Sequence, residues 1–246
     1  MNQEQAYLKA ARLILESERL TAFTGAGISV ESGVPPFRGK GGLWETRDPI
    51  FLDIGYFKAY PDNSWEEIKE IFYDTLGTAQ PNEAHRILAR WDATIITQNI
   101  DNLHQLAGSK RVYEFHGSWR DLLCLKCGER FPAAEINLQM LPPICGNCGG
   151  LLKPDFVFFG EPIPDRAREL SFEAAEATDV MLVIGSTGQV TPACYIPYIA
   201  RRSGAHVIEI NPEPSAFTDS VTNIYLQDKA TVALTRLDAL LETLTQ

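Results

Sequence analysis

The segment LTAFTGAGISVESGVPPFRGKGGLW, residues 20–44, decides the fold of this chain. Its first residues form a short apolar run that predicts a buried strand from Leu20 to Phe23. Gly25-Ala26-Gly27 follow at once, and small residues at such a turn let backbone N–H groups come close to a phosphate. A helix that opened directly after them would also point its positive N-terminus at that phosphate. The segment therefore predicts a strand–turn–helix unit that binds an anionic ligand.

The loop after this turn is rich in glycine and proline, which predicts irregular backbone. It contains Phe37 and Arg38, so it can carry an aromatic ring and a cation to the ligand that the glycines face. Many tight turns use glycine without binding phosphate, so the rest of the chain must also supply a matching site.

Further short apolar runs predict a parallel sheet. They span residues 93–97, 112–115, 180–184 and 207–210, with residues 224–226 as a last edge strand. Amphipathic helices are expected at both ends of the chain, the first over residues 7–15 and the last with Val232 on its apolar face. Apolar strands that alternate with helices indicate an α/β fold in which both faces of the sheet are covered.

Polar and glycine residues follow the expected strands. Ligands of parallel α/β sheets bind beyond the carboxyl ends of the strands, so we expect one binding site where these ends meet. The residues at the strand ends are Gly25-Ala26-Gly27, Gln98-Asn99-Ile100-Asp101, His116-Gly117, Gly185-Ser186-Thr187 and Asn211.

Residues 43–77 interrupt the alternation with an aromatic, irregularly apolar stretch. This composition predicts a small helical insertion. Asn63 or Ser64 is expected to cap a helix that runs through Ile68 and Ile71, because both residue types accept hydrogen bonds from the first free N–H groups of a helix.

Four of the five cysteines form two C-x-x-C pairs separated by seventeen residues: Cys124, Cys127, Cys145 and Cys148. This spacing is typical of a zinc ribbon. Four thiolates fill the tetrahedral shell of Zn²⁺ and leave no open position, so the expected metal is one structural Zn²⁺ per chain. The alternative is a set of redox or fortuitous cysteines. Cys194 stands apart and is interpreted as a small core residue.

The length of 246 residues and the 45% hydrophobic content allow one sizeable domain with a smaller module. The net charge is −10 and no basic stripe is visible, so we expect no direct nucleic-acid binding. An acidic surface suits a cationic partner such as a lysine-rich peptide, although it also serves solubility alone.

Targeting signals are not expected from the sequence. No apolar segment follows a basic N-terminus, and no apolar run approaches roughly 18 residues, so neither a signal peptide nor a membrane span is expected. Paired cysteines with metal-ligand spacing are typical of a reducing compartment, and we expect a cytoplasmic protein.

Two groups at the strand ends carry recognisable chemistry. The amides and carboxylate of Gln98-Asn99-Ile100-Asp101 can recognise a carboxamide and ribose hydroxyls; alternatively, Asn99 or Asp101 simply caps a helix. His116 can take a proton from a hydroxyl at neutral pH, although a lone histidine is more often a packing residue. A structural role is expected for the other histidines, which are His85, His104 and His206.

The run DFVFFGE, Asp155 to Glu161, is apolar and breaks at Gly160. A partly exposed strand of this kind can pair with an extended peptide and line a tunnel for an aliphatic side chain. Ordinary core packing is the alternative.

Together these motifs resemble the sirtuin family, in sequence order and over about residues 20–230. The motifs that carry the resemblance are Gly25-Ala26-Gly27-Ile28-Ser29, Phe37-Arg38-Gly39, Thr97-Gln98-Asn99-Ile100-Asp101, His116-Gly117, the two C-x-x-C pairs, Phe159-Gly160-Glu161 and Gly185-Ser186-Thr187. The resemblance implies an NAD-dependent protein-lysine deacylase, with acetylated lysine-containing proteins or peptides as substrates.

The resemblance also implies a two-part fold. Residues 1–38, 78–120 and 155–246 would form a Rossmann-like NAD-binding domain. Residues 39–77 and 121–154 would form a small domain from the helical insertion and the zinc ribbon.

Residue roles follow from the same resemblance. His116 matches the catalytic base, with Asn99 as its catalytic partner. The residues that resemble NAD contacts are Gly25, Ala26, Ser29, Phe37, Arg38, Gln98, Asn99, Ile100, Asp101, Gly185, Ser186, Asn211 and Ala230. The residues that resemble the acyl-lysine tunnel are Val157, Phe159, Gly160, Val190 and Tyr73.

Some positions depart from the sirtuin pattern. Pro36 stands where sirtuins commonly carry Asp or Thr, and it stiffens the cofactor loop. ADP-ribosyl transfer or NAD hydrolysis at the same site is therefore an alternative activity, and a non-enzymatic NAD-sensing zinc adaptor is another. The loop GKGGLW and Gly188 resemble the branch of the family that often removes acidic acyl groups such as succinyl. In that branch a Tyr is followed three residues later by an Arg, but Leu76 stands there after Tyr73, so deacetylation is expected.

Overall fold

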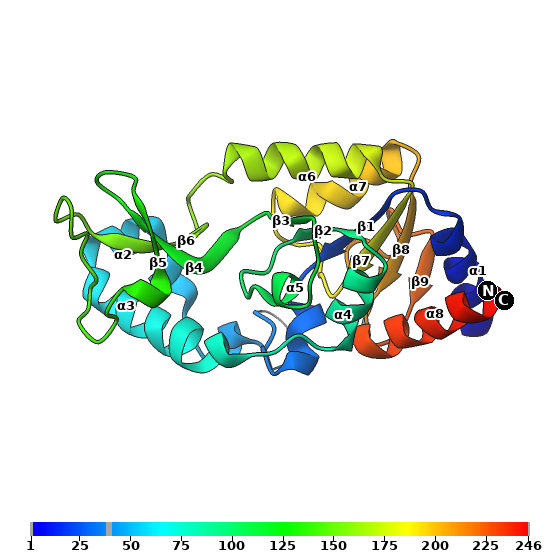
Figure 1. Ribbon diagram of the computed structural model, residues 1–246, viewed down its shortest axis with the longest axis horizontal. Coiled ribbons are helices and arrows are strands. Elements are labelled where there is room, and N and C mark those ends of the chain that lie inside the picture. The colour runs from blue at the N-terminus through cyan, green and yellow to red at the C-terminus, as the bar shows by residue number, and fades with distance from the viewer. Residues whose placement is uncertain (1, 38–40, 246) are drawn as a thin grey trace.

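The computed structural model describes residues 2–37 and 41–245 (Figure 1). The helices are α1 (Gln3–Glu16), α2 (Ile54–Ala59), α3 (Pro61–Ile68), α4 (Glu83–Arg90), α5 (Leu103–Leu106), α6 (Asp165–Ala177), α7 (Ile196–Arg202) and α8 (Ala230–Leu244). The strands are β1 (Leu20–Thr24), β2 (Thr94–Thr97), β3 (Val112–Glu114), β4 (Gly117–Cys124), β5 (Arg130–Pro132), β6 (Leu152–Phe156), β7 (Val180–Ile184), β8 (His206–Ile210) and β9 (Ile224–Leu226).

Six strands form the predicted parallel sheet, in the order β3-β2-β1-β7-β8-β9. From β1 the chain builds outward to β2 and β3, and the later strands build outward on the other side of β1. The order of the strands therefore reverses between β1 and β7, the place where such sheets bind their ligands. The α/β prediction is confirmed.

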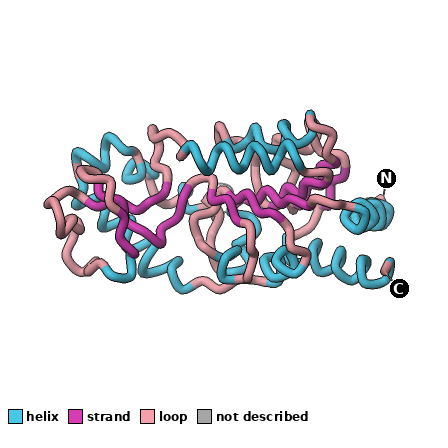
Figure 2. Tube along the Cα trace, turned by 45° about the horizontal axis from the view of Figure 1, so that its top comes forward, coloured by secondary structure: helices cyan, strands magenta, loops and turns pink. Residues whose placement is uncertain are grey.

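Helices cover both faces of this sheet, which Figure 2 shows as a layer of strands between two layers of helices. α1, α4 and α8 pack on one face around an aliphatic core, and α6 and α7 pack on the other. Strands covered on both faces need continuous apolar side chains, and every residue of β7 is buried. Val232 was expected on the apolar face of α8, but it is 48% exposed, because Ala233, Leu234 and Leu237 make that face.

A second sheet has three antiparallel strands in the order β5-β4-β6. It lies with α2 and α3 at the end of the molecule away from α1 and α8 (Figure 1). Its core is rich in aromatic residues, with Phe57, Trp65, Phe72, Phe156 and Phe158 all buried. The helical insertion and the cysteine segment thus share one hydrophobic core.

The predicted cap of the inserted helix is wrong. α3 begins at Pro61, two residues before Asn63, and Tyr60 precedes it without a side-chain cap. Proline at the first helical position needs no hydrogen-bond partner for its nitrogen and already has a helical φ, so it sets the start of the helix. The helix then continues as a π-helical turn over Lys69–Thr75.

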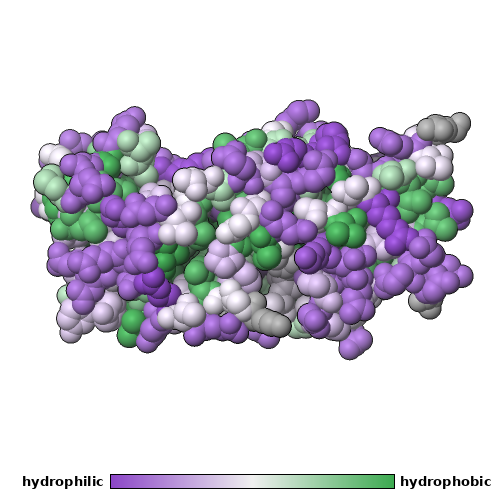
Figure 3. Space-filling model, turned by 90° about the horizontal axis from the view of Figure 1, so that it is seen from below, coloured by the Kyte–Doolittle hydropathy of each residue, from purple (hydrophilic) through white to green (hydrophobic). Residues whose placement is uncertain are grey.

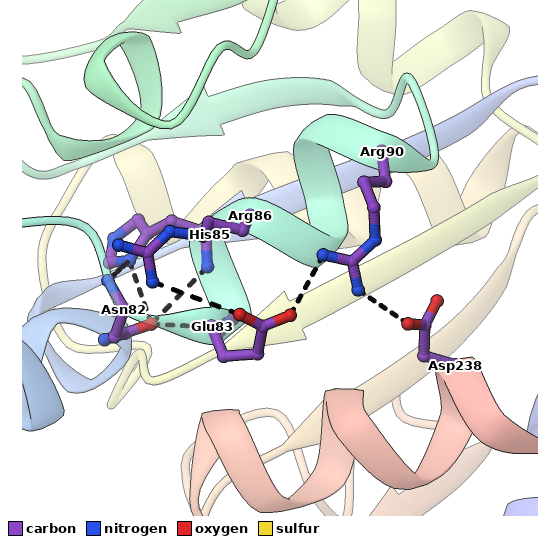
Figure 4. Close-up of polar contacts among 7 residues, drawn as sticks. Asn82, Glu83, His85, Arg86, Arg90 and Asp238 are labelled. Carbon is purple, nitrogen blue, oxygen red and sulfur yellow. Dashed lines mark hydrogen bonds and ion pairs between the residues drawn. The ribbon is translucent and has the colours of Figure 1, made fainter.

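α4 is fixed at both ends by polar contacts (Figure 4). Asn82 caps its first turn, since its Oδ1 accepts hydrogen bonds from the backbone N–H groups of Ala84 at 3.0 Å and His85 at 3.4 Å. At the last turn Arg90 pairs with Glu83 at 2.9 Å and with Asp238 of α8 at 2.6 Å. These pairs are exposed and contribute little energy, but they orient α4 against α8.

The surface seen in Figure 3 is mostly hydrophilic, with hydrophobic side chains in patches in the middle of this face and toward both of its ends. Among the described residues, no helix combines the length and the apolar character needed to span a bilayer.

Candidate active site

Glycines join the two loops at the switch point of the parallel sheet. The backbone N–H of Gly25 donates to the carbonyl of Ile184 at 2.9 Å, and that of Gly27 donates to Gly185 at 2.9 Å. A Cβ atom on Gly27 would lie 2.5 Å from the Cα of Gly185, closer than real Cβ contacts. Gly185 itself has φ +63°, which favours glycine. Glycine is therefore required here for contact between two backbones.

The helix expected after these glycines is a 3₁₀ helix, Ala26–Ser32. It places Ser29 in a buried polar group with Asn99 and Asp101, which follow β2. The hydroxyl of Ser29 donates to Asp101 Oδ2 at 2.6 Å, and Asn99 Nδ2 donates to Ser29 Oγ and to the carbonyl of Gly25, both at 3.2 Å. Burial raises the pKa of the Asp101 carboxyl, although these hydrogen bonds oppose the shift.

Two histidines lie behind this group and were missed as part of the site. His85 Nε2 is 3.5 Å from Ser29 Oγ, and His104 Nε2 is 3.0 Å from the hydroxyl of Thr24. Burial lowers the pKa of both side chains, that of His85 to about 4, so both rings are neutral at pH 7. The predicted structural role agrees with this placement, but only the packing of α4 and α5 against the glycine turn brings them here.

His116 lies between β3 and β4, where the chain passes from one sheet to the other. Its Nδ1 is 3.0 Å from the carbonyl oxygen of Gln98. A carbonyl only accepts, so Nδ1 carries the proton and Nε2 keeps its lone pair. Burial lowers the pKa of the imidazole, while the bond to Gln98 opposes this shift. The ring is therefore neutral at pH 7 and is held in the tautomer that leaves Nε2 as a base.

The far side of the switch point carries a second polar group. Gln98 Nε2 donates to Ser186 Oγ at 2.9 Å, and Asn211 Nδ2 donates to the carbonyl of Ser186 at 3.1 Å. Glu209, fully buried in β8, was missed by the sequence reasoning. Its carboxylate accepts hydrogen bonds from Asn211 and from three hydroxyl groups on the next loop, those of Ser215, Thr218 and Thr222. Glu209 thereby fixes the side chain of Asn211.

The remaining candidate cofactor residues are Phe37, Arg38, Ile100, Ala26 and Ala230. Phe37 stacks on Trp44, with ring centroids 5.4 Å apart, which joins the loop to the aromatic core. Arg38 lies outside the described residues. Ile100 is buried in the same aromatic core. Ala26 begins the 3₁₀ helix, and Ala230 begins α8, where it is 5% exposed.

Three of the candidate substrate residues, Val157, Phe159 and Gly160, follow the end of β6. The strand stops at Phe156, earlier than the apolar run suggested, and residues 157–161 continue as a loop. Phe159 is 43% exposed, and Val157 and Val190 are half-buried. Tyr73 lies in the aromatic core, where its hydroxyl donates to the carbonyl of Trp119 at 2.9 Å and its ring stacks on Trp65.

The four paired cysteines meet in one cluster, with all sulfur atoms within 4.8 Å of one another. Cys124 Sγ is 3.5 Å from Cys148 Sγ, and Cys127 Sγ is 3.9 Å from Cys145 Sγ. Zn–S bonds of about 2.3 Å in a tetrahedron give sulfur–sulfur distances of about 3.8 Å. The cluster therefore fits a zinc ion with four thiolate ligands.

Comparison with known proteins agrees with this geometry. Residues 25–192 match the model of the Sir2 family. The chain is 45% identical to "NAD-dependent protein deacylase 2" of Pyrobaculum aerophilum, over 94% of each chain. Among solved structures, it is similar to a Sir2 homolog–NAD complex, with TM-score 0.87 and 35% identity over 96% of this chain and 94% of the other. It is also similar to a Sir2–p53 peptide–NAD⁺ complex, with TM-score 0.87 and 31% identity over 100% of both chains. The chain therefore belongs to the Sir2 family.

Proposed function

We propose that this protein is an NAD-dependent protein-lysine deacylase that acts mainly as a deacetylase. The observation that carries the proposal is His116, a neutral imidazole whose Nδ1–H is held by Gln98 and whose Nε2 is free as a base. It stands at the carboxyl edge of the sheet beside buried amide and carboxyl groups. A protein that only senses NAD needs no such base.

The residues at this edge fit NAD. Backbone contact between Gly27 and Gly185 keeps side chains away from the turn on which a pyrophosphate would lie. Asn99 and Asp101 offer donors and acceptors for a carboxamide and ribose hydroxyls, and Asn211 serves the adenosine side with Ser186. Gly25, Ala26, Ser29, Phe37, Gln98, Ile100 and Ala230 complete the proposed set within the described residues, and Arg38 belongs to it from the sequence.

NAD, when bound, supplies the ribose carbon that the acyl oxygen attacks after nicotinamide leaves, and the hydroxyl that receives the acyl group. His116 would take the proton of a ribose hydroxyl at Nε2, which lets that oxygen reach the acyl carbon. Asn99 would orient the ribose beside it. Phe37 would exclude water, which would otherwise hydrolyse the cofactor.

A neutral acyl group suits the proposed tunnel of Val157, Phe159, Gly160, Val190 and Tyr73 better than a succinyl group. A buried carboxylate needs a cation, best an arginine that binds it with two hydrogen bonds. Arg47 is already engaged by Glu67 and Glu70, both at 2.5 Å, and Lys69 pairs with Asp74 at 2.6 Å. We propose acetylated lysine in proteins or peptides as the substrate.

The remaining features complete the proposal. Cys124, Cys127, Cys145 and Cys148 would hold one structural Zn²⁺ per chain. The small domain would comprise residues 39–77 and 121–154, and the NAD-binding domain the rest of the chain. Thiolate ligands need reducing conditions, so we place the protein in the cytoplasm. We propose neither nucleic-acid nor membrane binding.

An NAD-dependent assay over one peptide carrying acetyl, longer acyl or succinyl groups tests this proposal. We expect nicotinamide release that depends on the acyl-lysine peptide, together with loss of the acyl group from lysine. Nicotinamide release that is the same without acyl-lysine would instead identify ADP-ribosyl transfer or NAD hydrolysis, with Pro36 altering the cofactor loop.

A further inference from the structure

The loop of residues 156–161 leaves the small sheet and holds the proposed acyl-lysine residues. Its outer part is fixed to the helical insertion, because the N–H of Phe159 donates to Leu52 at 2.8 Å and the carbonyl of Phe159 accepts from Ile54 at 3.1 Å. Its first part is fixed to the active site, because the N–H of Val157 donates to the carbonyl of His116 at 2.8 Å. Phe158 points into the aromatic core between these contacts.

A buried lysine lies directly under this loop. The side chain of Lys153, in β6, is 3% exposed. Its ammonium group donates to the carbonyls of Pro154 at 2.9 Å and Phe156 at 2.6 Å and to Glu161 Oε2 at 3.0 Å. An ammonium group has three protons, so these three acceptors satisfy it. Two of the acceptors lie in the last three residues of β6, and the third, Glu161, lies five residues after the strand ends.

Glu161 and Phe158 complete this arrangement. The carboxylate of Glu161 also accepts the backbone N–H of Phe158 at 2.8 Å, so one side chain ties both Lys153 and the middle of the loop. The ammonium lies 4.1 Å from the centroid of the Phe158 ring, within range of a cation–π contact. Gly160, with φ +87°, turns the chain so that Glu161 can reach back.

A contribution to folding stability does not by itself explain the buried ion pair of Lys153 and Glu161. Burial lowers the pKa of Lys153, because a charged ammonium loses its hydration there, and the nearby Glu161 carboxylate opposes that shift. Replacing a buried ion pair by apolar residues is often neutral or stabilising, whereas such a pair can select one conformation of the chain. The conformation selected here is that of residues 156–161, which leaves Phe159 43% exposed.

We propose that Lys153 and Glu161 are positioning residues that hold residues 156–161 in the shape that receives the acyl-lysine peptide. This inference rests on the proposed function. Neither residue is assigned contact with a reacting atom. They act through the loop backbone, so their loss is expected to weaken peptide binding and to leave NAD binding and the chemistry of bound substrate largely intact.

Steady-state kinetics of Lys153→Met test this inference. Methionine fills the space of the lysine stem and cannot hold the carbonyls or Glu161. We expect the KM for an acetylated peptide to rise roughly 10-fold, with kcat and the KM for NAD changed by less than about 2-fold. Lys153→Arg, which keeps the charge and its donors, should recover most of the loss.

Arg130→Met provides a matched control. Arg130, in β5, forms an ion pair with Asp155 of β6 at 2.6 Å, but its side chain is 61% exposed. We expect its peptide KM to stay within about 2-fold of the wild type, because exposed pairs contribute little.

Glu161→Gln carries the test if Lys153→Met fails to fold. The amide keeps an acceptor for Phe158 and removes the charge that faces Lys153. A peptide KM raised roughly 5-fold would support the inference. An unchanged peptide KM in the folded Lys153→Met variant or in Glu161→Gln would overturn it, as would an equal rise in the KM for NAD. A wild-type protein without acyl-peptide-dependent nicotinamide release would refute the proposed function instead.

Discussion

The two sheets of this molecule are stabilised by different means. The parallel sheet has buried apolar strands between two layers of helices, so side-chain packing is the main stabilisation of its fold. The antiparallel sheet has three strands, two of them with three to five residues, and it joins an aromatic core to a cluster of four cysteines. Small modules commonly need a metal or a disulfide because they bury too little apolar surface. The cofactor side of the site should therefore survive perturbations that remove the substrate side.

Removal of one cysteine ligand should produce the largest difference in stability between the two sheets. In Cys145→Ala we expect loss of zinc and loss of structure around β4–β6, since zinc contributes on the order of 10 kcal/mol in small structural sites. Hydrogen exchange should show fast exchange in β4–β6 and retained protection in β1, β7 and β8. Cys194→Ala, outside the cluster, is the control. Protein purified without chelators that contains no zinc would contradict the prediction.

Removal of the proposed base should leave both sheets intact and strongly reduce turnover. We expect His116→Ala to reduce kcat for deacylation roughly 10²-fold or more, the usual scale for loss of a general base. NAD binding, measured by calorimetry, should persist because the proposed phosphate contacts come from other residues. His206→Ala changes an exposed histidine at the start of β8 and should retain activity. Near-normal turnover of His116→Ala would leave His116 with a packing role only.

The acyl preference tests the substrate side alone. We expect kcat/KM for an acetylated peptide to exceed that for its succinylated form by tens-fold, because one missing charge-assisted pair costs on the order of 2–3 kcal/mol. Both forms should be compared at saturating NAD. Equal turnover of the succinyl form would mean that a cation such as Lys58, or Arg47 freed from its glutamates, reaches the tunnel.

Acidification tests the cofactor side alone. His85 has a pKa of about 4 in the folded protein against about 6.5 when unfolded. Protons therefore bind the unfolded chain first as the pH falls below about 6.5, and the folded state loses roughly 2 kcal/mol from this group by pH 5.

His85→Gln serves as the comparison, because it lacks this titration. The difference in unfolding free energy between it and the wild type, from urea titrations at each pH, should change by that amount between pH 7 and pH 5. The effect of acid on the zinc site is common to both proteins and cancels. A difference that stays constant with pH would contradict the assignment.

Local patterns predicted most of the parallel sheet. Apolar runs located its strands, and the glycines of residues 25–27 located the turn at the switch point. Both features depend on neighbouring residues, because a buried strand needs consecutive apolar side chains and a tight turn needs glycine. The cysteine spacing likewise predicted the cluster, because the ligands of a zinc ribbon occur in the sequence as two C-x-x-C pairs. Asn63 was wrong as a cap because Pro61 imposes an earlier helix start.

Contacts between distant segments were not predictable. His85 and His104 lie beside the proposed cofactor residues only because α4 and α5 pack against the glycine turn. Glu209 lies in an apolar strand, and its hydroxyl partners come from a loop that follows it. In the sequence, nothing distinguishes Lys153 from an exposed lysine, and it is buried only because residues 156–161 fold over it. Single-sequence patterns carry no record of such contacts.

The short connection between the sheets gives His116 two attachments. Its imidazole is bonded to Gln98 after β2, while its backbone carbonyl receives the N–H of Val157 at the start of the proposed peptide loop. A Cβ atom on the next residue, Gly117, would lie 2.3 Å from the carbonyl oxygen of Asp155, so only glycine lets the two backbones lie this close. The proposed peptide loop is therefore attached to the backbone of the residue that carries the proposed base. One backbone hydrogen bond thus sets the start of the proposed peptide loop and the residue that carries the imidazole side by side.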